Sequence, residues 1–311
     1  MSIGLHRELP NLQRMDRVIV TSCPACKGSD LVPFMQVVDH RVSRESFDLS
    51  QCANCGLVIT QHQPLESNIG RYYETGDYIS HSEHGTGFMD TVYYTVRKHM
   101  LRTKASWIRR LAKGNTLIDI GAGTGAFAGY MQKLGWKVHG FEPNDRAREI
   151  AWKSYGLNIE KISAMFEFPQ RSADVVTMWH VLEHVHDPEK YLRGIHMMLN
   201  DQGILFLAMP NHMSLDARFY KAEWAAWDVP RHLWHFDAKA TQLIAERMGF
   251  QSVHKYILPF DAFYVSLISE GYRGGGVLRQ VRGLCIGSVS LLLSWLFKDK
   301  ASSIVYVFRK I

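Results

Sequence analysis

Two short apolar runs in the middle of the chain each end in residues whose types suit ligand binding. Leu117-Ile-Asp-Ile is followed by glycines at alternate positions, Gly121, Gly123 and Gly125, and Val138-His-Gly-Phe is followed by Glu142. Glycine carries no Cβ, so the backbone of such a turn can approach a ligand closely. A carboxylate at the end of the next strand can accept hydrogen bonds from both hydroxyls of a ribose. Together the two runs predict nucleotide-type binding at the carboxyl ends of a parallel sheet.

The spacing of the glycines favours one kind of nucleotide site. The dinucleotide fingerprint is G-x-G-x-x-G, whereas here the third glycine comes one position early. The turn resembles motif I of the class I S-adenosylmethionine (SAM) methyltransferases, and Glu142 resembles the acidic ribose ligand of that family. The resemblance implies SAM as the cofactor. The cofactor-binding residues that it implies in the turn and at the strand ends are Asp119, Gly121, Ala122, Gly123, Gly125, Glu142, Pro143 and Trp179.

One motif departs from the family pattern. The family's motif II usually carries an acidic residue that binds the adenine amine, but the matching region here is Ser163-Ala-Met-Phe166, which has none. We expect the backbone amides of Ala164 and Met165 to contact the adenine instead, with Glu167 as the alternative.

Four cysteines form two pairs near the N-terminus. Cys23 and Cys26 make one C-x-x-C knuckle and Cys52 and Cys55 the other. Four thiolates from two knuckles suit a closed, tetrahedral structural zinc site, and such a metal replaces a hydrophobic core in a small segment. Free or redox-active cysteines are the alternative. We expect the fifth cysteine, Cys285, to be a buried thiol.

The order of apolar and amphipathic segments predicts an α/β fold. Strands are expected at 117–120, 137–141, 157–162, 173–179, 203–209 and 303–308, the last at an edge, and helices at 88–111, 126–133, 146–155, 188–198 and 238–248. This alternation is typical of a doubly wound, mostly parallel Rossmann-like sheet, for which the resemblance implies seven strands. The expected units are a zinc-ribbon module (1–70), a helical lid (71–112) and a SAM-binding core (113–311) with a helical insertion at about 259–300.

Several histidines after the fourth and fifth strands are candidates for the reacting site. His180 follows the fourth strand and is the first candidate for substrate contact, and a histidine can accept a proton near neutral pH. His232 and His235 are candidate bases, beside Arg231, which could hold a phosphate. Tyr78 in the lid is a further candidate catalytic residue. The structural alternatives are that Tyr78 packs the lid and that His235 only flanks a helix; Glu183 and His184 are expected to brace a helix.

Composition bounds the functional classes without choosing one. The chain has 311 residues, 46% hydrophobic, so we expect a sizeable core rather than disorder. Its net charge of +6 permits an anionic small molecule, nucleic acid or a membrane surface as partner. The first residues lack the apolar region of a secretory signal, so we expect a cytoplasmic protein, either a monomer or a homodimer.

An uncharged run, 284–297, leaves three interpretations open. It is too short to span a bilayer, and its small residues share one helical face. It can be a buried cap helix, a dimer face, or a helix at a membrane surface flanked by basic residues. The last interpretation predicts peripheral membrane contact through 277–300.

The leading functional prediction is a SAM-dependent methyltransferase acting on a small molecule. The arrangement of knuckles, glycine turn and histidines resembles the zinc-containing sugar methyltransferases, which implies a nucleotide-linked sugar or a related precursor as acceptor. The alternatives are a lipid-linked or quinone-type acceptor at a membrane surface, an RNA methyltransferase that uses the zinc ribbon, and a binding module without catalysis. Nucleic acid is not the expected partner, because the knuckle segment carries mixed charges.

Overall fold

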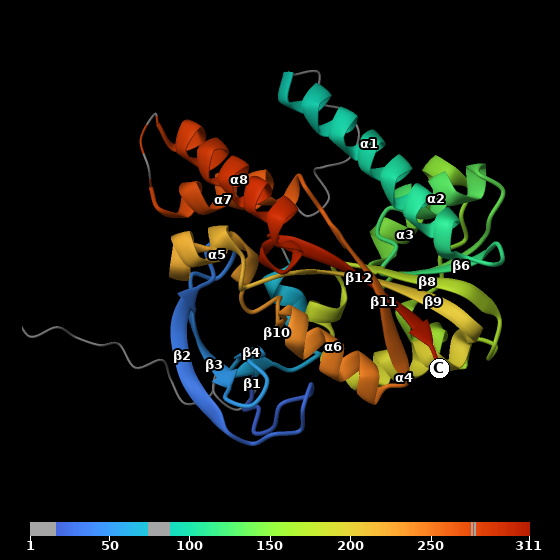
Figure 1. Cartoon of the computed structure of the whole chain (residues 1–311), viewed down its shortest axis with the longest axis horizontal. Coiled ribbons are helices and arrows are strands. Elements are labelled where there is room, and N and C mark those ends of the chain that lie inside the picture. Colours follow the sequence, from blue (N-terminus) through green and yellow to red (C-terminus); the bar gives the residue numbers. More distant parts are fainter. Residues whose placement is uncertain (1–16, 74–87, 275, 277) are drawn as a thin grey trace, which may run out of the picture.

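The computed structural model describes residues 17–73, 88–274, 276 and 278–311 (Figure 1). Its centre is a sheet whose six described strands lie in the order β11-β12-β9-β8-β6-β7. Their bounds are β6 (Thr116–Ile120), β7 (Lys137–Phe141), β8 (Ala173–Trp179), β9 (Leu199–Pro210), β11 (Phe250–Ile257) and β12 (Ser303–Lys310). β12 runs antiparallel to both of its neighbours, β11 and β9, and the other neighbouring pairs in this sheet are parallel. The predicted mostly parallel α/β sheet is therefore confirmed.

Helices cover both faces of this sheet, as Figure 1 shows. On one side lie α1 (Phe88–Leu111), α2 (Ala126–Lys133) and α3 (Asp145–Tyr155), and on the other lie α4 (Pro188–Met198) and α6 (Ala238–Arg247). Successive side chains of a strand point to opposite faces, so Leu117 of β6 packs in a cluster with Ile108 of α1 while Ile118 packs with Leu192 of α4.

Polar caps set where three of these helices begin. The side chains of Asn144, Asp187 and Asp237 each accept a hydrogen bond from the backbone N–H three residues further on, at the starts of α3, α4 and α6. Such caps satisfy a donor that the helix itself leaves unpaired. They explain why the predicted and observed helix starts agree within one residue.

Three strand predictions need correction. The central sheet has six strands among the described residues rather than seven. The strand expected at 157–162 contributes only one bridge, Phe141 to Glu160, because the chain then turns into a 3-10 helix, Ile162–Glu167. The tail strand lies between β9 and β11 and is antiparallel to both, not at an edge. The sequence analysis did not predict β11, because polar residues in this segment obscure the alternation of apolar and polar positions that is typical of a strand.

The N-terminal part forms a second, antiparallel sheet. Its strands are β2 (Leu31–Val38), β3 (Ser46–Cys52) and β4 (Val58–Thr60), and a short pair, β1 (Arg17–Val18) with β5 (Gln63–Pro64), lies beside them in the chain. The fourth strand of this sheet is β10 (Trp234–His235), which comes from far along the chain and pairs with β4. The N-terminal sheet therefore fixes the segment that carries the predicted base histidines.

Helices α5 (Leu215–Tyr220), α7 (Asp261–Tyr272) and α8 (Arg279–Leu296) lie together, at the upper left of Figure 1. The small face of α8 packs closely on α7, since a Cβ on Gly287 would come within 2.9 Å of the Cα of Phe263. The opposite face of α8 is exposed and apolar, and Cys285 is exposed there rather than buried. Of the helices that the structure describes, none has the length and apolarity to cross a bilayer.

Candidate functional site

The glycine turn after β6 holds three left-handed residues with different surroundings. Gly121, Gly123 and Gly125 have φ values of 70°, 54° and 78°, a region that side chains disfavour. A Cβ on Gly121 would lie 2.4 Å from Val181, and one on Gly125 would lie 2.8 Å from Ala151. A Cβ on Gly123 would meet nothing within 4 Å. The outer glycines therefore serve packing, and Gly123 presents bare backbone to open space.

Glu142 lies against this turn at the end of β7. The Gly123 N–H donates to Glu142 Oε2 over 2.9 Å, and the Asn144 N–H donates to Oε1 over 3.0 Å. Burial raises the pKa of this carboxyl above its usual value. Each carboxylate oxygen has a second lone pair free to accept. The residues present therefore fit a ligand that offers two hydroxyls beside the glycine turn, as the ribose of SAM does.

Asp119 lies below the turn rather than at its surface. Its Oδ1 accepts a hydrogen bond from Thr177 Oγ1 over 2.6 Å, and burial raises its pKa to about 7. A cation that sequence reasoning missed, Lys104 of α1, lies 4.0 Å from the centre of the Trp179 ring and interacts with Asp119 and Asp261. Burial lowers the pKa of Lys104 to about 8. Nothing in the pattern of α1 distinguishes this lysine from its exposed neighbours.

The other predicted cofactor residues follow the strand ends. Ala122 donates its N–H to Phe141 O over 3.0 Å, and Pro143 directly follows Glu142. Trp179 ends β8, and its indole N–H is buried without a hydrogen-bond partner among the described residues. The Ala164 N–H is already bonded to Lys161 O within the 3-10 helix over 3.0 Å, so its expected adenine contact would have to replace that bond.

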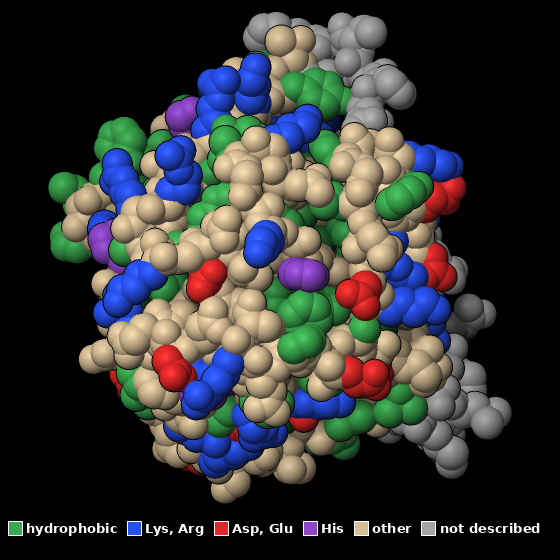
Figure 2. Space-filling model, turned by 90° about the vertical axis from the view of Figure 1, so that its right-hand side faces the viewer, with side chains coloured by type: hydrophobic (Ala, Val, Ile, Leu, Met, Phe, Trp, Pro, Cys, Tyr) green, Lys and Arg blue, Asp and Glu red, His purple; other side chains and the backbone are tan. Residues whose placement is uncertain are grey.

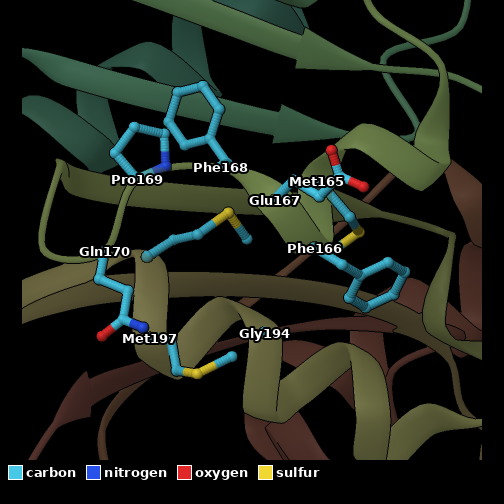
Figure 3. Close-up of a pocket in the computed structure, with 9 residues that line it drawn as sticks. Met165, Phe166, Glu167, Phe168, Pro169, Gln170, Gly194 and Met197 are labelled. Carbon is cyan, nitrogen blue, oxygen red and sulfur yellow. The ribbon is translucent and has the colours of Figure 1, made fainter.

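A pocket of about 300 Å³ beside Met165 is not part of this site. Figure 3 shows it between Phe166, Phe168 and the Met197 end of α4. The N–H groups just before β8 bond to Met197 O and Met198 O there, so the pocket lies at the amino end of β8. The candidate site lies at the carboxyl end of the same strand.

A cavity of about 290 Å³ opens at the carboxyl edge of the sheet. Its wall combines the ends of β8 and β9, the start of β12, the loop before β10, the length of α7 and one residue from the turn between β2 and β3. The lining residues are Arg41, His180, Pro210, Ala225, Ala226, Asp228, His232, Asp261, Tyr264, Val265, Ile268, Tyr272 and Ser303. Two of the predicted catalytic histidines, His180 and His232, therefore face one space, and the aromatic and aliphatic side chains of α7 make much of that space apolar.

His180 lies between two carboxylates. Its Nδ1 is 3.4 Å from Glu183 Oε1, and its Nε2 is 3.2 Å from Asp261 Oδ2. Burial lowers the pKa of His180, but the neighbouring carboxylates of Asp261 and Glu183 outweigh it and raise the pKa to about 9. At neutral pH His180 is therefore an imidazolium. It can donate a hydrogen bond to a substrate, but it is a poor proton acceptor.

The two candidate bases occupy different places. His232 lines the cavity, and its Nδ1 is 2.8 Å from Ala226 O. A carbonyl only accepts, so Nδ1 is the donor and Nε2 of the neutral ring keeps a lone pair for a proton or a metal ion. His235 is outside the cavity: it bonds Thr60 Oγ1 over 3.0 Å, and burial lowers its pKa well below the usual value. Tyr78 lies outside the described residues.

The prediction that Arg231 holds a phosphate conflicts with its contacts. Its guanidinium is buried and donates to Asp39 over 2.9 Å, to Asp228 over 2.8 Å and to Tyr72 O over 2.8 Å. These bonds tie the loop before β10 to the N-terminal sheet. Arg231 thus positions the neighbouring His232.

The four paired cysteines converge as predicted. Cys23 Sγ lies 3.5 Å from Cys55 Sγ, and Cys26 Sγ lies 3.4 Å from Cys52 Sγ; all four sulfur atoms lie within 4.8 Å of one another. Thiolates at ~2.3 Å from a zinc ion in a tetrahedron lie roughly 3.8 Å apart. The cluster therefore could hold zinc, with no ligand position left for catalysis.

Replacing Cys52 with serine is expected to abolish zinc binding and lower the thermal unfolding midpoint, because an ion held by all four thiolates would cross-link the two knuckles. Elemental analysis of the purified variant together with a melting curve measures both effects. Cys285→Ser, at an exposed position outside the cluster, is the matched control and should keep the full metal content. A Cys52→Ser variant with undiminished zinc would contradict the four-thiolate site.

The parallel sheet with one antiparallel strand, the glycine turn and the carboxylate on the next strand define a class I SAM-dependent methyltransferase. The chain belongs to the family described as "Methyltransferase domain", whose model matches residues 96–255.

Comparison with curated and solved proteins gives distant relatives. The ubiquinone biosynthesis O-methyltransferase of Cupriavidus pinatubonensis is 30% identical over 221 residues, which cover 67% of this chain and 79% of that protein. The enzyme of the same name from Actinobacillus pleuropneumoniae is 33% identical over 110 residues, and the chain spans 47% of its length. A solved SAM-dependent methyltransferase from Archaeoglobus fulgidus aligns with 72% of this chain and 100% of its own, at a TM-score of 0.48 and 14% identity.

Proposed function

We propose that the protein transfers the methyl group of SAM to a hydroxyl of a small amphipathic acceptor, lipid-linked or quinone-type, that is presented at a membrane surface. The observation that carries this proposal is the position of α7. One side of α7 forms the wall of the cavity through Tyr264, Val265 and Ile268. Its other side holds α8, whose outer face is apolar and exposed.

The outer face of α8 has the composition of an interfacial helix. Its exposed apolar residues are Leu278, Val281, Leu284, Val289, Leu292, Trp295, Leu296 and Phe297. Basic residues flank it, Arg279 at the start and Lys298 and Lys300 after the end. Helices that lie in a membrane surface combine such an apolar face with basic residues, and the net charge of +6 favours an anionic surface. We refer to these eight apolar residues as the α8 face.

The chemistry requires alignment and the loss of one proton. SAM supplies an electrophilic methyl group, and its transfer to oxygen is an in-line displacement that depends on positioning. The glycine turn and Glu142 would hold the nucleoside part of SAM. His180, as an imidazolium, can donate to an oxygen of the acceptor, and His232 can contact the hydroxyl that loses its proton.

The names of the relatives support a hydroxyl acceptor of the quinone type, since those proteins are called ubiquinone biosynthesis O-methyltransferases. The nucleotide-linked sugar that the sequence predicts is the second candidate. It is favoured by Arg41 and Asp228, a cation and an anion on the cavity wall that a sugar phosphate or hydroxyl could contact.

We also propose that the four cysteines hold a structural zinc ion and that nucleic acid is not the substrate. On the face in Figure 2 the described lysine and arginine side chains lie scattered among acidic and apolar ones. Nucleic-acid sites instead gather basic residues into one stripe or patch.

The double variant Trp295→Ser, Leu296→Ser is expected to weaken binding to anionic liposomes by roughly 10-fold or more, because burial of each large apolar side chain in the interface contributes about 1.5–3 kcal/mol. Sedimentation with vesicles of an anionic phospholipid measures the bound fraction. Turnover of a freely dissolved acceptor should persist.

The matched control is Trp152→Ser on α3. Trp152 is 61% exposed and Trp295 is 65% exposed, so both changes remove a surface tryptophan, but only the second lies on the α8 face. Equal liposome binding by all three proteins would contradict the membrane-surface proposal. A change in oligomeric state without a change in liposome binding would assign the α8 face to a second copy of the chain.

A further inference from the structure

Three potential metal ligands converge beside the cavity, apart from the four cysteines. One ligand atom each of Glu183, His184 and His232 lies within 4.8 Å of the other two. Glu183 and His184 belong to the short turn after β8, and His232 belongs to the loop before β10. The Leu233 N–H donates to Glu183 O over 2.8 Å, so the backbone itself holds the two segments together.

The carboxylate of Glu183 is buried and pairs with one histidine, but it accepts no hydrogen bond from the described residues. Its side chain is 1% exposed, and neither oxygen has a hydrogen-bond partner among the described residues. The nearest cation is His180, with Nδ1 at 3.4 Å from Oε1. The buried carboxylate of Glu270, by contrast, accepts hydrogen bonds from Arg282 and Tyr220. A buried carboxylate without hydrogen bonds is costly, and a bound cation would satisfy it.

The two imidazoles are oriented as metal ligands commonly are. Nδ1 of His184 lies 3.0 Å from Arg231 O and 3.0 Å from the Tyr73 hydroxyl, which can accept as well as donate, and Nδ1 of His232 lies 2.8 Å from Ala226 O. Both carbonyls fix the proton on Nδ1 and leave the lone pair on Nε2. A ligating histidine typically donates its other ring N–H to a carbonyl in this way.

We propose that Glu183, His184 and His232 form a site for a divalent transition-metal ion, such as zinc or manganese, at the edge of the acceptor cavity. Two imidazoles and one carboxylate suit such ions, and three protein ligands leave a position open, as in catalytic sites. Because His232 lines the cavity, an acceptor hydroxyl can reach that position.

This role rests on the proposed function and makes it more specific. A cation at the site lowers the pKa of a hydroxyl that contacts it. The hydroxyl proton then passes to water, a bond forms between the acceptor oxygen and the methyl carbon, and the bond from that carbon to the SAM sulfur breaks. The products are the methyl ether, S-adenosylhomocysteine and one proton.

Cobalt(II) added to the zinc-loaded full chain tests the site, because thiolate ligands give cobalt an intense near-ultraviolet charge-transfer band that nitrogen and oxygen ligands do not. We expect one cobalt ion per chain to bind with visible d–d absorption and without the thiolate band. Glu183→Gln should weaken this binding by ~100-fold or more, the upper end of what even outer ligand partners cost. His232→Gln is the second variant, and melting curves confirm that each one folds.

Glu270→Gln, which changes a buried glutamate that already has partners, is the matched control and should bind cobalt as the unmodified chain does. Cobalt that binds only with the thiolate band, or equally well to Glu183→Gln, overturns the site. If methyl transfer nevertheless continues, the proposed function stands and His232 acts on the proton directly. If cobalt binds as expected but no acceptor is methylated, the metal site stands and the proposed function fails.

Discussion

Glu142→Ala is expected to lower the affinity for SAM by about 100-fold or more. Hydrogen bonds to a charged group contribute about 1.5–3 kcal/mol each, and the ribose would lose two of them. The substitution also removes the acceptor that fixes the Gly123 N–H, so the turn that faces open space loses its anchor. Isothermal titration calorimetry with SAM measures the change directly.

The control for this prediction is Glu160→Ala. Glu160 pairs with β7 at the bridge beside Glu142, but its side chain is exposed. Its removal should leave SAM affinity unchanged. A Glu142→Ala variant that binds SAM as tightly as Glu160→Ala does would show that the carboxylate has no role in cofactor binding, and the assignment of the cofactor crevice would be wrong.

His232→Ala is expected to reduce turnover by roughly 10²–10⁴-fold, the range that positioned proton transfer contributes, with SAM affinity unchanged. The side chain borders the acceptor cavity, and no described contact joins it to the glycine turn or to Glu142. The same direction holds whether His232 removes the proton itself or binds a metal ion that assists the removal. Initial rates at saturating SAM, together with calorimetry, separate the two effects.

His235 provides the matched comparison, three residues away and also buried. His235→Ala should lower the melting temperature, because it removes the bond to Thr60 and a contact with the Trp227 ring. The folded fraction should keep its turnover, since His235 does not line the acceptor cavity. Equal losses of turnover in the two variants would mean that His232 also acts only through the fold.

The parts of the site within one short stretch could be predicted from the sequence. The glycine spacing and the carboxylate after the second strand located the turn and Glu142. Residues close together in the sequence form these features, so a short stretch of sequence is enough to predict them. The cysteine cluster could be predicted for the same reason, because the two knuckles leave few other ways to satisfy four thiols.

The surroundings of the histidines could not be predicted, because distant segments create them. His180 is positively charged through Asp261, a residue 81 positions later in the chain that no motif marks. His232 and His235 lie three residues apart and look equivalent in the sequence. The pairing of β10 with the N-terminal sheet buries His235 away from the cavity. Arg231 forms an ion pair with Asp39, from the N-terminal part of the chain, instead of the predicted contact with a phosphate. Each case depends on which remote carboxylate or strand the fold brings near.

The most direct test of the central claim is to incubate the full chain with SAM labelled in its methyl group, lipid extract and nucleotide sugars, and to locate the label by mass spectrometry. The proposed function predicts label on the oxygen of an organic-extractable compound, and far less of it with His232→Ala. Label confined to water-soluble sugars would assign the cavity to the sugar acceptor. A chain that binds SAM and transfers label to neither fraction would contradict the claim that this cavity receives a methyl acceptor of either kind.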